Sequence, residues 1–235
     1  MRWTLLVATL ALAACDVSTT TTQTPVSAPS QSNSSVSMNR TSFTNVVARV
    51  EPVAERECRS RLPGANCDFL IRIDGDRRAA PNAYQSEDES GRPVITFTES
   101  MISSTRNPDE LAFVLGHEAA HHIRGHLARQ AENAAAGAII FAGLAAMTGG
   151  SAADVQAAQQ LGEAVGARSY SKEFELEADQ LGTIITATAG YNPIAGSQYF
   201  ARIPDPGDRF LGTHPPNAER LEIVQRTAAQ MGLRQ

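Results

Sequence analysis

Residues 116–126, GHEAAHHIRGH, hold four of the chain's five histidines together with one glutamate. Within them, His117-Glu118-Ala-Ala-His121 is an HExxH motif. Residues four apart on an α-helix lie about 40° apart around its axis, so both imidazoles can reach one metal ion. Neutral imidazole suits zinc, and a catalytic zinc site takes three protein ligands and keeps one position open. Glu118 lies about 100° from His117, beside such an ion, where it can act as a general base.

The sequence around this motif predicts a helix with a defined start. Asn107 can cap the helix and Pro108 fits its first turn. Asp109 and Glu110 complement the positive end of the helix dipole. Apolar residues can bury the helix around the motif, namely Leu111, Phe113, Val114, Leu115 and Ile123. The motif is therefore expected on a helix that packs into the core.

The third metal ligand decides the class of the site. Metzincins place a histidine six residues after the second motif histidine, but Leu127 occupies that position here. Gly125 and His126 each miss the metzincin positions by one residue. On a continuous helix, His126 lies about 180° from His117, and His122 lies about 140° from it. Both are therefore expected to face away from the metal, as surface residues in preference to supporting ones.

A carboxylate from a later helix is the alternative source of the third ligand. Residues 171–182, SKEFELEADQLG, place Glu175 and Asp179 four residues apart on one helix face. One of them can bind zinc while the other orients a ligand histidine. Glu173 and Glu177 point elsewhere on such a helix and are expected to meet solvent.

The N-terminal segment, MRWTLLVATLALAAC, is typical of an exported bacterial lipoprotein. Residues 1–14 are expected to be a signal peptide, and Cys15 is expected to be lipidated. An ordinary signal peptide with an incidental cysteine is the less favoured alternative. The Ser-, Thr- and Pro-rich tether of residues 15–40 has too little apolar surface to fold. Residues 41–235 are expected to form a single domain.

Composition narrows the class of protein further. The net charge is −5 with 42% hydrophobic and 19% charged residues, which fits a soluble globular domain and gives no electrostatic basis for nucleic-acid binding. An exported chain with two further cysteines predicts one disulfide, between Cys58 and Cys67, across a Pro63-Gly64 turn. A metal role for these two cysteines is less favoured, because no second cysteine pair or nearby histidine supports it.

The rest of the chain predicts helices and two strands. The strands are expected at 69–74 and 93–98, with a polar loop before the second. Further helices are expected at about 152–167, 171–189, 194–202 and 216–231. Residues 133–153 carry no charge and consist mostly of Ala and Gly. We expect a buried helical hairpin or a flexible flap beside the site, with a surface that contacts lipid or an unfolded protein as a further alternative. A membrane span is less favoured.

The HExxH and ExxAD motifs together resemble the HtpX-like and CAAX prenyl protease-like family of gluzincin metallopeptidases. Within it, the chain is most similar to the soluble bacterial periplasmic branch and the related Oma-type enzymes. Thr213-His214-Pro215, followed by Arg220, resembles a downstream signature of that family. The resemblance implies a zincin-like α+β fold, mostly helical with a small β-sheet next to the active-site helix.

The resemblance also implies a role for each matching residue. It implies one Zn²⁺ per chain with three ligands, His117, His121 and Glu175. Glu118 would be the general base, and Asp179 would support the ligand shell. His214 would sit over the site, where it could stabilise the oxyanion or fill the zinc's open position in a resting state.

The function expected from these residues and this resemblance is zinc-dependent endopeptidase activity. Substrates would be unfolded or misassembled cell-envelope proteins, bound along an exposed edge at residues 94–98. The protein would act in quality control on the periplasmic side, attached by lipid to the inner or outer membrane. One alternative is a chaperone-like or self-inhibited lipoprotein with a latent zinc site. Another is a membrane-embedded protease that uses residues 133–153 as a span.

Overall fold

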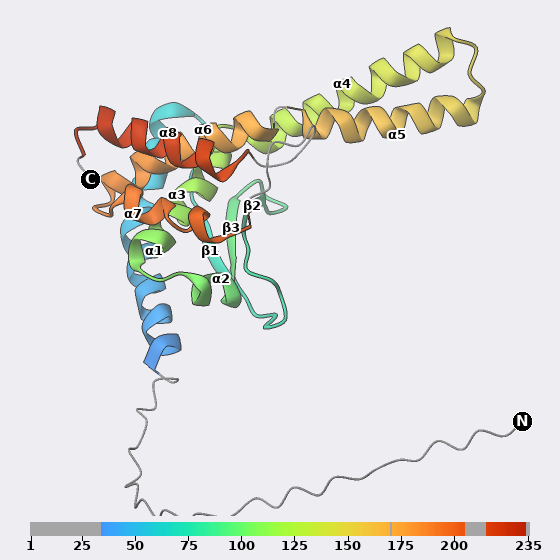
Figure 1. Ribbon diagram of the computed structural model, residues 1–235. Coiled ribbons are helices and arrows are strands. Elements are labelled where there is room, and N and C mark those ends of the chain that lie inside the picture. The colour runs from blue at the N-terminus through green and yellow to red at the C-terminus, as the bar shows by residue number, and fades with distance from the viewer. Residues whose placement is uncertain (1–33, 170, 205–214, 234–235) are drawn as a thin grey trace, which may run out of the picture. The chain divides into compact units, whose positions relative to one another are not determined.

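The structure is a computed structural model that describes residues 34–169, 171–204 and 215–233. The helices in these ranges are α1 (Ser34–Arg61), α2 (Glu99–Ser104), α3 (Pro108–Ile123), α4 (His126–Met147), α5 (Ala152–Arg168), α6 (Ser171–Thr188), α7 (Pro193–Ser197), the 3-10 helix η1 (Phe200–Arg202) and α8 (Asn217–Gln230). The strands are β1 (Leu70–Asp74), β2 (Ala83–Glu87) and β3 (Pro93–Thr98). Figure 1 shows the helices packed around this small sheet. The predicted α+β class, mostly helical with a small sheet, is confirmed.

Strand β3 lies in the centre of the sheet, whose order is β1-β3-β2. It pairs in parallel with β1 and antiparallel with β2, and all of its residues are buried. Residues 94–98 are therefore not an exposed edge, and the prediction that a peptide adds to them is wrong. Strand β2 lies at the edge of the sheet instead. The sequence does not predict it, because AYQSE offers one aromatic residue and no apolar alternation.

Helix α1 supplies part of the core. Its apolar residues Phe43, Val46 and Val50 are three and four positions apart and all buried, and the helix packs against α3. The helix begins at Ser34, so the last residues of the segment expected as a tether, 15–40, form its first turns.

A disulfide fixes the end of α1. Cys58 and Cys67 are bonded, with Cα atoms 5.7 Å apart, and both side chains are buried. The bond joins the last turns of α1 to the residues just before β1, so it holds the helix against the sheet.

Helices α3 and α6 pack with their backbones in contact. A Cβ atom on Gly116 would lie 3.0 Å from the Gly182 carbonyl oxygen, and one on Gly182 would lie 2.9 Å from the His117 backbone nitrogen. A side chain at either glycine would push the two helices apart. The contact therefore brings the HExxH segment of α3 directly against the ExxAD segment of α6.

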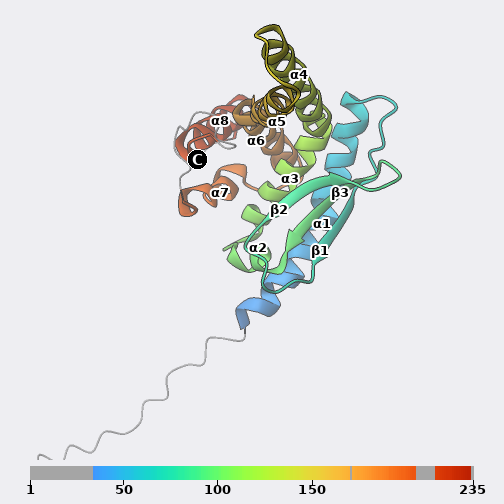
Figure 2. The same ribbon diagram turned by 90° about the vertical axis from the view of Figure 1, so that its right-hand side faces the viewer.

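Helices α4 and α5 form a hairpin that projects from the other described elements (Figures 1 and 2). The Ser151 hydroxyl accepts a hydrogen bond from the Asp154 amide, and the Asp154 carboxylate accepts one from the Ser151 amide, so the start of α5 is capped at the hairpin tip. The hairpin predicted for residues 133–153 is present, but it is largely exposed, and its predicted burial is wrong. Across the described ranges, no helix has both the length and the apolar character needed to cross a membrane.

Candidate metal centre

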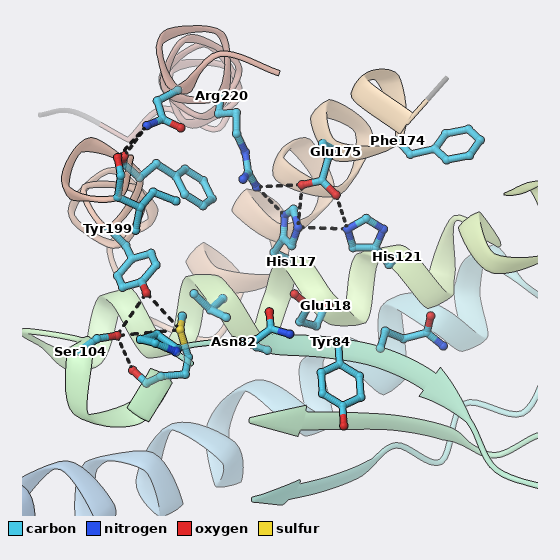
Figure 3. A pocket seen from close by; sticks show the side chains of 18 of the residues that line it. Asn82, Tyr84, Ser104, His117, Glu118, His121, Phe174, Glu175, Tyr199 and Arg220 are labelled. Carbon is cyan, nitrogen blue, oxygen red and sulfur yellow. Dashed lines mark hydrogen bonds and ion pairs between the residues drawn. The ribbon is translucent and has the colours of Figure 1, made fainter. Parts of the chain in front are cut away.

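His117, His121 and Glu175 bring three metal-binding atoms together at the contact of α3 and α6 (Figure 3). The two Nε2 atoms lie 3.0 Å apart. Glu175 Oε2 lies 3.5 Å from His117 Nε2, and Oε1 lies 3.3 Å from His121 Nε2. Ligands bound to zinc at tetrahedral angles stand about 3.3 Å from one another. Two imidazole nitrogens and one carboxylate at these separations fit a zinc ion with one open position.

His117 is held by a buried ion pair behind it. Its Nδ1 lies 2.9 Å from Asp179 Oδ1, and Asp179 is fully buried. This bond occupies Nδ1 and leaves Nε2 to face the other two ligand atoms, which is the usual support for a metal-binding histidine. The ligand therefore has a fixed tautomer and ring orientation whenever Nδ1 donates to the carboxylate.

Arg220, from α8, is the functional residue to which the sequence assigns no role. Its guanidinium donates two hydrogen bonds to Asp179, Nε to Oδ2 at 2.7 Å and Nη2 to Oδ1 at 2.8 Å. The same Nη2 lies 3.4 Å from Glu175 Oε2. Its Cζ lies 3.6 Å from the centroid of the Phe200 ring. Arg220 therefore positions two carboxylates, and its place in the downstream signature is the only sequence signal for it.

The buried charges shift one another's protonation. Burial raises the pKa of Asp179. The charge of Arg220 and the hydrogen bonds from Arg220 and His117 lower it by more, so the pKa of Asp179 lies below its usual value. Burial lowers the pKa of His117, yet the hydrogen bonds and charges of Asp179 and Glu175 outweigh it and raise that pKa to about 10. In the metal-free protein, His117 therefore carries a proton that metal binding must displace.

Glu118 lies on the same helix as the two histidines and lines the same cleft. Figure 3 places its carboxylate between α3 and strand β2. Burial raises the pKa of Glu118, and the neighbouring His117 and His121 charges work against that rise. A carboxyl group with a raised pKa beside a metal can both accept and return a proton near neutral pH.

The cleft over these residues has a volume of about 970 Å³. Edge strand β2 lines one side, with Ala83, Tyr84 and Gln85, and the ligand helices α3 and α6 line another. A cleft of this volume is large enough for an extended peptide segment.

The prediction that His126 faces away from the metal is wrong. Helix α3 ends at Ile123, and the chain turns at Gly125, whose φ of 65° is in the left-handed region. The turn brings His126 back, so its Nδ1 lies 2.8 Å from Nδ1 of His121. The expectation that His126 faces away assumes a continuous helix, which this turn interrupts.

The contacts of His126 continue to α6. Its Nε2 lies 3.2 Å from Glu177 Oε2, and Arg129 donates to Glu177 at 2.8 Å. Glu177 is therefore paired, against the expectation that it only meets solvent, whereas Glu173 is exposed as expected. Burial and the His121 charge lower the pKa of His126 to about 4, despite the opposing Glu177. A neutral His126 can accept a hydrogen bond from His121 at its Nδ1 atom and donate one to Glu177 from its Nε2 atom.

His122 takes no part in this cluster. Its Nε2 lies 3.0 Å from the carbonyl oxygen of Asn66, and its ring packs edge-on against Phe69. The two remaining site predictions, His214 and Cys15, lie outside the described residues.

Comparisons with a family model and with individual known proteins both identify metallopeptidases. The model of peptidase family M48 matches residues 42–228. A Vibrio cholerae protein provisionally named a beta-barrel assembly-enhancing protease is 33% identical over 153 residues, 58% of this chain and 31% of that protein. Mitochondrial metalloendopeptidase OMA1 of Saccharomyces cerevisiae is 27% identical over 166 residues, 66% of this chain and 46% of that protein. The beta-barrel assembly-enhancing protease of Escherichia coli is 29% identical over 159 residues, 58% of this chain and 31% of that protein. The chain spans less than half the length of each of these relatives.

Proposed function

Because the chain belongs to peptidase family M48, we propose that it is a zinc-dependent metalloendopeptidase. The observation that carries the proposal is the convergence of His117, His121 and Glu175 in an open cleft that Glu118 also lines. These three side chains would hold the ion. A zinc ion bound there supplies Lewis acidity, which polarises a carbonyl and lowers the pKa of water.

The chain's own residues perform the proton transfers of the proposed reaction. Glu118 accepts a proton from the attacking water and returns it to the nitrogen of the leaving amine. Asp179 and Arg220 keep His117 in one orientation throughout, and His126 does the same for His121. His214 is proposed to stabilise the oxyanion or to block the resting site, and it lies in the segment outside the described residues.

The substrates are proposed to be unfolded or misassembled proteins of the cell envelope. Edge strand β2 supports this, because it borders the cleft and a peptide can add to it as a further strand. Strand addition reads the peptide backbone more than its side chains, so it selects extended chains over folded ones. The similarity to a beta-barrel assembly-enhancing protease supports a role in the cell envelope, and the similarity to a mitochondrial metalloendopeptidase supports endopeptidase activity. We propose a periplasmic location with a lipid anchor at Cys15.

Digestion of casein by zinc-loaded protein tests the enzymatic proposal. Glu118→Gln should remove the proton acceptor and lower the rate by roughly a hundredfold or more. Glu173→Gln is the matched control, because Glu173 is an exposed carboxylate on α6 and its loss should leave the rate unchanged. A chelator should stop digestion, and added zinc should restore it.

Three results would change the proposal. Wild type and Glu118→Gln digesting casein equally would contradict a role for Glu118 as the base. An inert wild type with an active His214→Ala variant would show a latent site that His214 blocks. If wild type, Glu118→Gln and His214→Ala are all inert with zinc bound, the enzymatic proposal fails.

A further inference from the structure

The outer face of helix α4 exposes large apolar side chains that the proposed reaction does not use. Ile139, Ile140, Leu144 and Met147 are 74%, 65%, 61% and 88% exposed. Successive residues advance by 100° around a helix, so these four fall within one arc of about 140°. No charged residue occurs from 133 to 153. These side chains give α4 an apolar face. Figure 1 shows that the hairpin carrying it projects from the other described elements.

The inner face of the hairpin explains why these side chains point outward. A Cβ atom on Gly137 would lie 2.1 Å from the Gly162 carbonyl oxygen, and one on Gly166 would lie 2.0 Å from that of Asn133. The two helices therefore touch backbone to backbone at these glycines, and a large side chain at any of them would push the helices apart. Gly162 and Gly166 form a small-xxx-small pair, the packing that helices use where lipid removes the hydrophobic drive to associate.

Helix α5 presents a different surface. Its exposed residues include four glutamines and glutamates, Gln156, Gln159, Gln160 and Glu163, beside alanines, Asp154 and Arg168, and Leu161 is its one exposed large apolar side chain. The hairpin therefore combines an apolar face on α4 with a more polar surface on α5. That combination suits the boundary between lipid and water, where one side is buried among acyl chains and the other stays hydrated.

The composition of the tip favours lipid over a protein partner. Trp, Tyr and Arg provide most of the binding energy at protein interfaces, and residues 130–160 contain none of them. The hairpin projects from the other described elements, and a fluid bilayer needs only apolar area to receive it. The predicted lipidation of Cys15 would also hold this domain at a bilayer surface.

We propose that the outer face of α4 inserts into the interface of a lipid bilayer and sets the orientation of the catalytic cleft above it. The proposal is independent of peptide hydrolysis. It holds for a protein with an inactive site, so failure of the casein test leaves it standing.

A local fluorescent reporter in the full chain tests this insertion. Trp3→Phe removes the chain's single tryptophan, and Met147→Trp then places one reporter at the apolar tip. The matched control is Gln160→Trp, on polar helix α5. Phosphatidylcholine vesicles carrying brominated acyl chains should quench the reporter at 147 and leave the one at 160 largely unquenched. Because quenching acts over short range, it reports acyl chains at the reporter itself, and the comparison of positions 147 and 160 holds the contribution of the N-terminal segment constant.

A charged side chain on the apolar face of α4 should weaken the quenching of the reporter at position 147. Adding Ile140→Glu or Leu144→Glu to the Met147→Trp protein should weaken quenching, with the partition constant falling about tenfold for each change. Three outcomes would overturn the proposal. They are equal quenching or none at both positions, a blue shift without vesicles that grows with protein concentration and indicates a second copy, and a shift caused only by unfolded casein. The single reporters decide the question even if a glutamate variant fails to fold.

Discussion

The metal centre and the α4–α5 hairpin are joined by the turn at Gly125. Each departs from the usual rule that charged side chains are exposed and large apolar ones are buried, and they do so in opposite ways. The centre buries charge, with Asp179 at 0% and Arg220 at 5% exposure. The hairpin exposes large apolar side chains such as Met147, at 88%. Buried charges persist where each has a partner, and an exposed apolar face persists where something outside the chain covers it. Departures of this kind mark functional regions, because stability alone would remove them.

Arg220→Ala should have the largest effect on the folded protein. The substitution removes the guanidinium that makes two hydrogen bonds to the buried Asp179 carboxylate. The free energy of unfolding should therefore fall by about 3–5 kcal/mol. Urea titration followed by circular dichroism measures this. Arg226→Ala, on the same helix with an exposed ion pair to Glu222, should cost at most about 1 kcal/mol. Equal losses for the two variants would contradict the buried pair.

Alkaline pH should weaken the metal-free protein through His117. Its folded pKa is raised from 6.5 to about 10, because Asp179 and Glu175 outweigh burial. The resulting stability is fully present below pH 6.5 and is lost as pH rises toward 10. The loss should be smaller than for Arg220→Ala, because Asp179 keeps its arginine.

Urea titrations at pH 6 and pH 10 measure this loss with and without zinc. Zinc should abolish the dependence on His117, because a ligand histidine is already neutral. A His117→Asn variant provides the control, and a metal-free protein that is equally stable at both pH values would contradict the shift.

His126→Ala should weaken zinc binding without destroying the fold. It removes the hydrogen-bond partner of His121 Nδ1, and loss of such a supporting residue typically costs ten- to a hundredfold in metal affinity, or about 1.4–2.8 kcal/mol. Competition with a chromogenic zinc chelator measures the affinity. His122→Ala is the matched control from the same stretch of sequence, because His122 contacts Asn66 and Phe69 instead, and its zinc affinity should equal that of wild type. The cobalt-substituted absorption spectrum should change for His126→Ala alone.

The sequence predicts half of this centre well and the other half poorly. His117, Glu118 and His121 follow from local spacing, because one helix with the Asn107 cap fixes their relative directions. Glu175 and Asp179 share a helix face, but their distance from the histidines depends on long-range packing at two glycines.

The contacts that sequence reasoning misses all depend on a change of chain direction. The turn at Gly125 returns His126 to the site, and the path of the chain into α8 delivers Arg220. Edge strand β2 owes its place to pairing with β3 rather than to its own apolar pattern. The exposure of α4 depends on backbone contact with α5, which a charge-free sequence cannot distinguish from burial.

A polar side chain on the hairpin should have the smallest effect of all on the folded protein in solution. Ile140 is 65% exposed, so Ile140→Gln removes little buried area and should change the free energy of unfolding by at most about 0.5 kcal/mol. Val46, by contrast, is 1% exposed on α1, and Val46→Ala should cost more than 1 kcal/mol because it leaves a cavity. Thermal unfolding without vesicles measures both. An Ile140→Gln loss as large as that of Val46→Ala would mean that the α4 face is covered within the protein itself, and the contrast between the two regions would fail.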